Sequence, residues 1–171
     1  MSIRKFACSL FALAALSLPA YASESTHAQA QHWSFKGMFG TYDRAALQRG
    51  FEVYRQVCAS CHSMNLLSYR NLEYLGYSPD QVKAIASEYN VMDGPNDEGE
   101  MFERPARPSD RFKAPFANKQ AAMYANNGAY PPDMSLLVKA RHGGADYIYG
   151  FLTGYEEAPE GTTLMAGQHW N

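Results

Sequence analysis

The sequence predicts an all-α domain in which short helices are joined by long irregular loops. Three observations support this. Apolar residues recur at three- to four-residue spacing in several short segments, convincing two-residue alternation is absent, and Gly and Pro clusters interrupt the helical patterns repeatedly. The 149 residues from Ser23 to Asn171 have the size of a single domain.

The first predicted helix covers residues 44–57. Its apolar positions have helical spacing and are Ala46, Leu47, Phe51, Tyr54 and Val57. Asp43 precedes the run and is a favourable N-cap. This helix leads directly into the most distinctive motif of the chain.

A second helix is expected from Pro79 to about Tyr89, because Ser78 is a good cap and Pro is favoured at the first helical position. Residues 93–100 follow as an exposed loop with Gly and Pro as breakers. The four acidic residues of this loop are either ordinary solvated surface or a docking site for a basic partner. Residues 104–115 continue as extended loop.

Three further helices are expected towards the C-terminus. The first is short and covers 119–126, the second runs from Met134 to about His142, and the third covers 145–153. Asp133 would cap the second, and Gly143 and Gly144 would end it. The third is rich in aromatic residues, which form either core or the wall of a cofactor pocket.

Residues 1–22 have the pattern of a secretory signal peptide. Arg4 and Lys5 precede an apolar run, and Ala20-Tyr21-Ala22 is an A-x-A cleavage site. The run is too short for a membrane span, which needs about 20 apolar residues. Removing this segment, which holds two basic and no acidic residues, changes the net charge from −2 to −4. The mildly acidic chain argues against nucleic acid as a partner and leaves room for a basic protein.

Cys58-Ala59-Ser60-Cys61-His62 has the spacing of a covalent haem-attachment motif. Each thiol can add to one vinyl group of the porphyrin, and His62 then lies close enough to the iron to bind it axially. A redox dithiol is less well supported, because such a motif belongs near a strand-helix unit. Half of a zinc site needs further ligands, but the other histidines are scattered and Cys8 is the only other cysteine.

Arg141 is a candidate partner for haem. Haem carries two propionates, and a planar guanidinium pairs well with a carboxylate. The alternative is a surface arginine placed favourably near a helix end.

Nearly the whole chain after the predicted signal peptide resembles cytochrome c1, the haem-bearing subunit of the cytochrome bc1 complex. The resemblance rests on nine segments in order, at residues 49–54, 57–64, 93–96, 104–105, 126–129, 131–135, 140–144, 146–147 and 152–155. It implies the fold of a class I c-type cytochrome and one covalently bound haem c.

The resemblance also implies roles for individual residues. Cys58 and Cys61 would carry the thioethers, and His62 would be the proximal iron ligand. Arg141 would pair with a propionate. The lower-ranked haem-pocket residues are Asn126 and Tyr147 near the haem edge, and Pro131 or Pro132 on the proximal side.

The implied function is electron transfer rather than catalysis by the isolated chain. The subunit would sit with cytochrome b and the Rieske iron-sulfur protein in the complex, accept one electron from the Rieske protein and pass it to a soluble cytochrome c. The expected location is the bacterial inner membrane, with the haem domain on the periplasmic side.

Two features of the family are expected beyond Asn171, namely the methionine that is the sixth ligand and a C-terminal membrane anchor. The chain therefore resembles a fragment of a longer protein. Met165 and Met134 are interpreted as packing residues rather than as that ligand.

Two other functions are weighed. A periplasmic haem enzyme or gas sensor would have an open sixth site, but no distal His/Arg pair can be nominated. A periplasmic interaction domain without haem would yield no covalent pigment. No catalytic residue is assigned.

Overall fold

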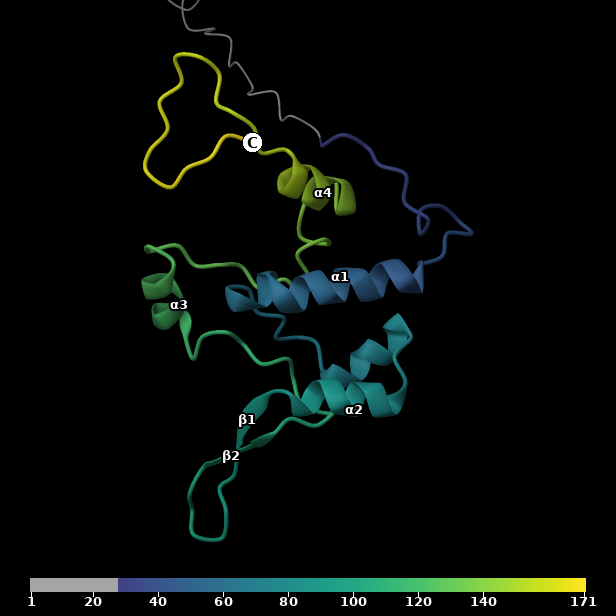
Figure 1. Cartoon of the computed structure of the whole chain (residues 1–171), viewed down its shortest axis with the longest axis vertical. Helices are drawn as coiled ribbons and strands as arrows, with labels where there is room; N and C mark the ends of the chain where they lie inside the picture. The colour runs from purple at the N-terminus through teal and green to yellow at the C-terminus, as the bar shows by residue number, and fades with distance from the viewer. Residues whose placement is uncertain (1–27) are drawn as a thin grey trace, which may run out of the picture.

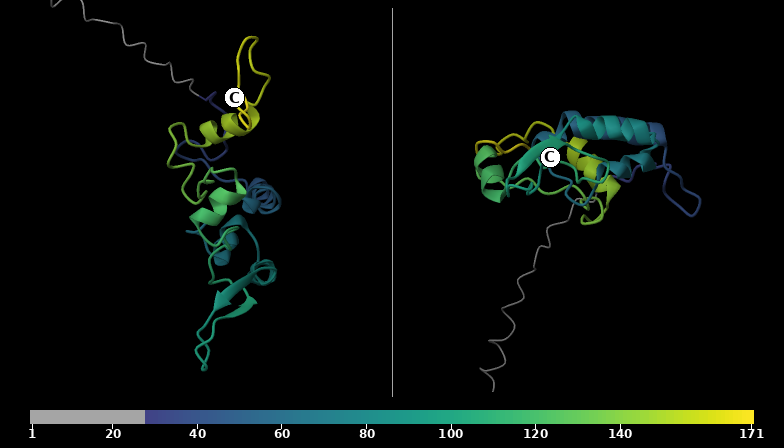
Figure 2. Two further views of the ribbon diagram at one scale, coloured as in Figure 1. Left: turned by 90° about the vertical axis from the view of Figure 1, so that its left-hand side faces the viewer. Right: turned by 90° about the horizontal axis from the view of Figure 1, so that it is seen from below.

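The computed structural model describes residues 28–171, so the predicted signal peptide at residues 1–22 lies outside the described range. The elements in chain order are α1 (Arg44–Gln56), the 3-10 helices η2 (Cys58–Ser60) and η3 (Tyr69–Leu75), α2 (Pro79–Ser87), β1 (Asn90–Asp93), β2 (Phe102–Pro105), α3 (Lys119–Ala125) and α4 (Ala145–Thr153). They succeed one another along the long axis, from α4 through α1 and α3 to α2 and the strands (Figures 1 and 2).

Four of the five predicted helices are confirmed within about two residues of their expected ends. Asp43 caps α1, where its Oδ1 accepts hydrogen bonds from the backbone N–H groups of Ala45 and Ala46 at 2.9 and 3.2 Å. Ser78 caps α2 together with Gln81, in a reciprocal capping box. These local signals position the helices correctly because they act within one turn.

The all-α prediction is wrong. Strands β1 and β2 form a two-stranded antiparallel sheet, in which Asn90 pairs with Pro105 and Asp93 pairs with Phe102, and much of the described chain is irregular. Each strand has only four residues, which is too short for a two-residue period to be recognised. The exposed loop predicted at 93–100 is confirmed for residues 94–100, which lie in the connection between the strands, whereas Asp93 is the half-buried last residue of β1.

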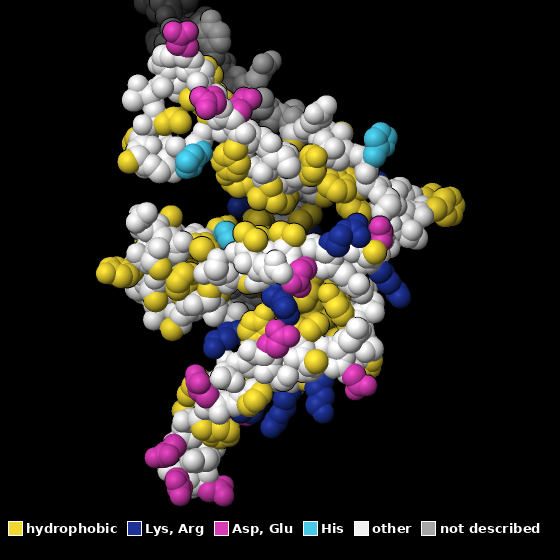
Figure 3. Space-filling view, viewed as in Figure 1, with side chains coloured by type: hydrophobic (Ala, Val, Ile, Leu, Met, Phe, Trp, Pro, Cys, Tyr) yellow, Lys and Arg dark blue, Asp and Glu magenta, His cyan; other side chains and the backbone are white. Residues whose placement is uncertain are grey.

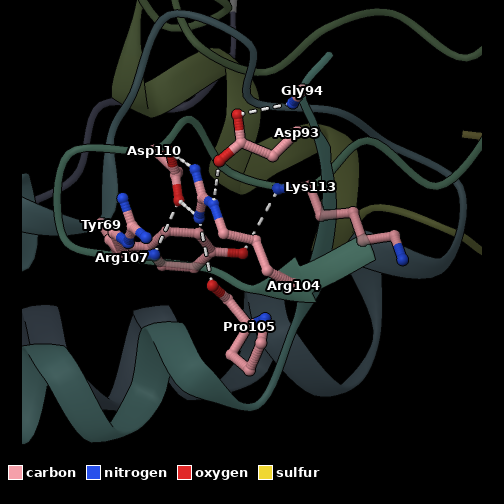
Figure 4. Close-up of polar contacts among 8 residues, drawn as sticks. All are labelled: Tyr69, Asp93, Gly94, Arg104, Pro105, Arg107, Asp110 and Lys113. Carbon is pink, nitrogen blue, oxygen red and sulfur yellow. Dashed lines mark hydrogen bonds and ion pairs between the residues drawn. The ribbon is translucent and has the colours of Figure 1, made fainter. Parts of the chain in front are cut away.

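Arg104 stabilises the base of this hairpin. It lies between two carboxylates, and its Nε pairs with Asp93 while its Nη1 lies 2.6 Å from Oδ2 of Asp110 (Figure 4). Hydrogen bonds from Arg104 hold the pKa of both Asp93 and Asp110 below the usual range. The guanidinium fork thus ties β1 and β2 to the loop that follows.

The helix predicted at 134–142 is also wrong, because residues 135–144 form a series of turns. The carboxylate of Asp133 accepts a hydrogen bond from the backbone N–H of Ser135 at 2.9 Å, as a helix cap would. It also accepts one from the backbone N–H of Asn65, which is distant in the sequence. Tertiary hydrogen bonds therefore compete with the helix that the local pattern favours.

The core lies where α1, η3, α2 and the segment after β2 meet. Its buried hydrophobic residues are Tyr54, Tyr69, Leu72, Val82, Ala86, Ala106 and Phe112. Burial raises the pKa of Tyr54 and of Tyr69 to about 12, so both phenols are neutral at physiological pH. Because Tyr54 belongs to the last turns of α1, the core fixes the helix that leads into Cys58.

Candidate functional site

The motif begins immediately after α1. The backbone turns tightly there, with the N–H groups of Cys61 and His62 both donating to the carbonyl of Cys58, at 3.1 and 2.8 Å. Cys58 and Cys61 are half-buried free thiols. The turn, which consists of η2 and the two residues after it, therefore holds Cys58, Cys61 and His62 close together, as covalent attachment to a porphyrin requires.

The ring of His62 is oriented by a residue 70 positions away. Its Nδ1 lies 2.8 Å from the carbonyl oxygen of Pro132. A carbonyl can only accept, so Nδ1 carries a proton, and in the neutral imidazole the lone pair is then on Nε2. This is the arrangement that metal-binding histidines adopt, with one nitrogen hydrogen-bonded to a backbone carbonyl and the other available to the metal.

The backbone of His62 is held from the core side. The hydroxyl of Tyr54 donates to the carbonyl of His62 at 3.3 Å. The candidate ligand is thus fixed through its main chain by the core and through its ring by the segment at 131–135.

Pro131 and Pro132 lie beside the motif. Pro131 and Cys61 line the same cavity of about 250 Å³, and the other residues that line it are Ser63, Asn65, Ala114, Pro115, Phe116, Ala117, Asn118, Lys119, Ala122 and Tyr130. Pro132 contributes its carbonyl to His62. The structure therefore brings together Cys58, Cys61, His62 and this pair of prolines.

The other predicted pocket residues make no described hydrogen bond to the motif within residues 28–171. Asn126 donates from its side chain to the carbonyl of Ala122 at 2.7 Å, at the end of α3. Tyr147 stacks on Phe151 within α4, with ring centroids 6.1 Å apart. Arg141 is exposed and donates to the carbonyl of Ala140 at 3.4 Å. Among the hydrogen bonds described for residues 28–171, none links these three residues to His62.

A hollow separates α4 and the C-terminal segment from α1 and α3, and hydrophobic side chains gather along it (Figure 3). The elements on both sides carry large exposed hydrophobic residues, among them Val53 and Val57 at the end of α1, and Phe151 and Leu152 on α4. Tyr147 and Phe151 also line a cavity of about 630 Å³. Contiguous exposed apolar surface is typical of a site that binds a ligand or a partner.

These residues fit a haem. The chain offers two free thiols at the attachment spacing, an imidazole oriented through its Nδ1 by the carbonyl of Pro132, and apolar surface nearby. Within residues 28–171 there is no cluster of three or more His, Cys, Asp or Glu residues that could bind a metal ion by itself. The attachment motif and its oriented histidine are typical of the c-type cytochrome class.

Comparison with known proteins specifies the family. The model of the cytochrome C1 family matches residues 33–171, and the chain belongs to this family. Cytochrome c1 of Rhodospirillum rubrum is 54% identical over 125 residues, which are 73% of this chain and 46% of that protein.

Mitochondrial relatives are similarly close. A protein of Arabidopsis thaliana named "Cytochrome c1 1, heme protein, mitochondrial" is 54% identical over 139 residues, which are 81% of this chain and 45% of that protein. The "Cytochrome b-c1 complex catalytic subunit, mitochondrial" of Candida albicans is 48% identical over 151 residues, which are 88% of this chain and 52% of that protein. The chain thus spans about half the length of these relatives. Family membership confirms the predicted resemblance and haem c as the cofactor.

Within the described residues, no helix has both the length and the apolar character needed to cross a membrane.

Proposed function

We propose that this chain is the haem domain of an electron-carrier subunit of the cytochrome bc1 complex, and not an enzyme by itself. Cys58 and Cys61 form the two thioether bonds, and His62 binds the iron through Nε2. The observation that carries this proposal is the 2.8 Å contact between Nδ1 of His62 and the carbonyl of Pro132, because it leaves the other nitrogen free for a metal.

When bound, haem supplies an iron that changes its oxidation state by one electron. The protein residues tether it, orient it and exclude water from it. Half-buried thiols in a rigid turn hold the ring beside His62. Exposed apolar side chains such as Val57 and Leu152 become a dry wall when they are covered, which limits the reorganisation of solvent around a changing charge.

The remaining pocket residues keep the roles that the resemblance implies. Pro131 or Pro132 would lie against the proximal side of the haem, and Asn126 and Tyr147 would lie near its edge. Arg141 pairs with a propionate, which requires its exposed guanidinium to change position from its contact with Ala140.

The electron partners follow from the family. The name of the relative from Candida albicans assigns that protein to a cytochrome b-c1 complex. In the proposal this chain sits with cytochrome b, receives its electron from the Rieske iron-sulfur protein and passes it to a soluble cytochrome c. The exposed acidic residues Asp97, Glu98 and Glu100 in the hairpin loop would steer a basic acceptor by long-range attraction.

The proposed location is the bacterial inner membrane, with this domain on the periplasmic side. The predicted signal peptide supports export, and the match to Rhodospirillum rubrum is compatible with a bacterial source. The relatives are about twice as long as the matched segment, and we expect the sixth ligand and the membrane anchor in the part of the protein beyond Asn171.

Covalent pigment tests the proposal. The full-length protein, expressed with a periplasmic haem-maturation system, should give a haem-stained band at its own mass on a denaturing gel. The reduced protein should resist carbon monoxide, because both axial positions are occupied. A colourless protein would refute haem attachment, and ready binding of carbon monoxide would favour a gas-binding site instead.

Loss of Arg141 should shift the haem potential. Arg141→Leu removes a positive charge beside a propionate. Because this loss stabilises the oxidised haem, which is the more positive form, the midpoint potential should fall. Lys139→Leu removes the same charge two residues away and serves as the control in a redox titration. Equal midpoint potentials in the two variants would show that Arg141 is an ordinary surface residue and does not pair with a propionate.

A further inference from the structure

Asp133 connects the segment after Pro132 to the segment after His62. Its Oδ2 accepts from the hydroxyl of Ser63 at 2.7 Å and from the backbone N–H of Asn65 at 2.8 Å. Its Oδ1 accepts from the backbone N–H of Ser135 at 2.9 Å. One side chain therefore joins two parts of the chain that lie about 70 residues apart.

Two more hydrogen bonds join the same segments. The N–H of Met134 donates to the carbonyl of Ser63 at 2.8 Å, and the N–H of Leu66 donates to the hydroxyl of Ser135 at 3.0 Å. Asp133 lies at the centre of this set. It is the only ionised member, because the other partners are neutral hydroxyl and backbone groups.

The carboxylate stays ionised in the folded protein. Burial would raise the pKa of Asp133, but hydrogen bonds from Asn65, Ser135 and Ser63 outweigh it and lower the pKa to about 2. An ionised carboxylate only accepts hydrogen bonds, and all three of its partners are donors. Charge-assisted bonds of this type are stronger than neutral ones.

The connection has a direct consequence for His62. Pro132 immediately precedes Asp133, and His62 immediately precedes Ser63. Holding Asp133 on Ser63 and Asn65 therefore fixes the distance between the carbonyl of Pro132 and Nδ1 of His62, which is 2.8 Å. The strength of that bond sets the orientation of the imidazole and its basicity as a ligand.

We propose that Asp133 is a positioning residue for the iron ligand, which holds the Pro132 carbonyl against His62 and thereby tunes the haem potential. The inference rests on the proposed role of His62. Helix capping is not the main role of Asp133, because residues 135–144 form turns. Two of its three hydrogen bonds are instead to Ser63 and Asn65, just after the motif.

The test uses Asp133→Asn in the full-length protein, matured with haem in its native membrane. The amide can accept at only one of its two terminal atoms, so it cannot satisfy all three donors. A weaker bond from Nδ1 makes His62 less basic and stabilises ferric iron less, so the midpoint potential should rise. We expect a change of at least twofold in the one-electron equilibrium constant, about 18 mV at 59 mV per tenfold, together with altered low-spin g-values in electron paramagnetic resonance.

Asp110→Asn is the matched control. Asp110 also accepts three bonds, from two nitrogens of Arg104 and from the N–H of Arg107, but it lies at the base of the hairpin. Its loss should leave the potential and the g-values unchanged. A wild-type potential and spectrum in Asp133→Asn would overturn the inference.

Ser63→Ala provides a milder test if Asp133→Asn does not accumulate. It removes only the 2.7 Å bond, and the potential should rise by a smaller amount. No shift in Ser63→Ala would then overturn the inference. Wild-type protein without covalent haem would instead refute the proposed function, so the two failures are distinguishable.

Discussion

Replacing His62 by Ala should abolish the low-spin spectrum of the matured full-length protein while covalent attachment persists. The imidazole is the one candidate axial ligand that the described structure orients, through Nδ1 on the Pro132 carbonyl and Tyr54 on its own carbonyl. Its removal leaves the iron with at most one protein ligand. Absorption and electron paramagnetic resonance spectra should show essentially all of the low-spin signal converted to high spin.

Two comparisons sharpen this experiment. His32→Ala removes an exposed histidine and should leave the spectrum of the protein unchanged. His62→Gly opens the same site, so added imidazole should enter it and restore much of the low-spin signal. A low-spin spectrum that survives His62→Ala without added imidazole would disprove the ligand assignment.

The sequence predicted the fold well where the signals are local. Asp43 and Ser78 cap helices as expected because each acts on backbone N–H groups two or three residues away. It failed where distant partners decide. Arg104 joins β1 to the loop at Asp110, and a periodicity pattern contains no information about such a pair.

For the site, too, the sequence predicted the local motif but not the contacts between distant residues. The spacing of Cys58, Cys61 and His62 was enough to nominate the motif, because attachment chemistry needs them adjacent in sequence. The bond from His62 to Pro132 crosses 70 residues, so only the resemblance suggested that these prolines lie nearby. The local pattern predicts Asp133 as the cap of a helix that the structure does not contain at 134–142, whereas its bonds to Ser63 and Asn65 appear only in three dimensions.

Replacing both motif cysteines, Cys58→Ala with Cys61→Ala, should remove all covalent pigment from the protein. Both thiols are free and half-buried, and they are the only cysteines outside the predicted signal peptide. No other side chain in the described range can form a thioether. Haem staining of a denaturing gel should therefore show no band for the double variant.

The single variants separate attachment from positioning. One remaining thioether should still hold haem through denaturation, because each sulfur forms its own bond. The turn that carries both residues is closed by the backbone carbonyl of Cys58, which neither substitution removes, so His62 should stay in place. Ser60→Ala, between the two cysteines, is the control and should stain like wild type. Pigment in the double variant that resists acid acetone would show that haem is attached elsewhere.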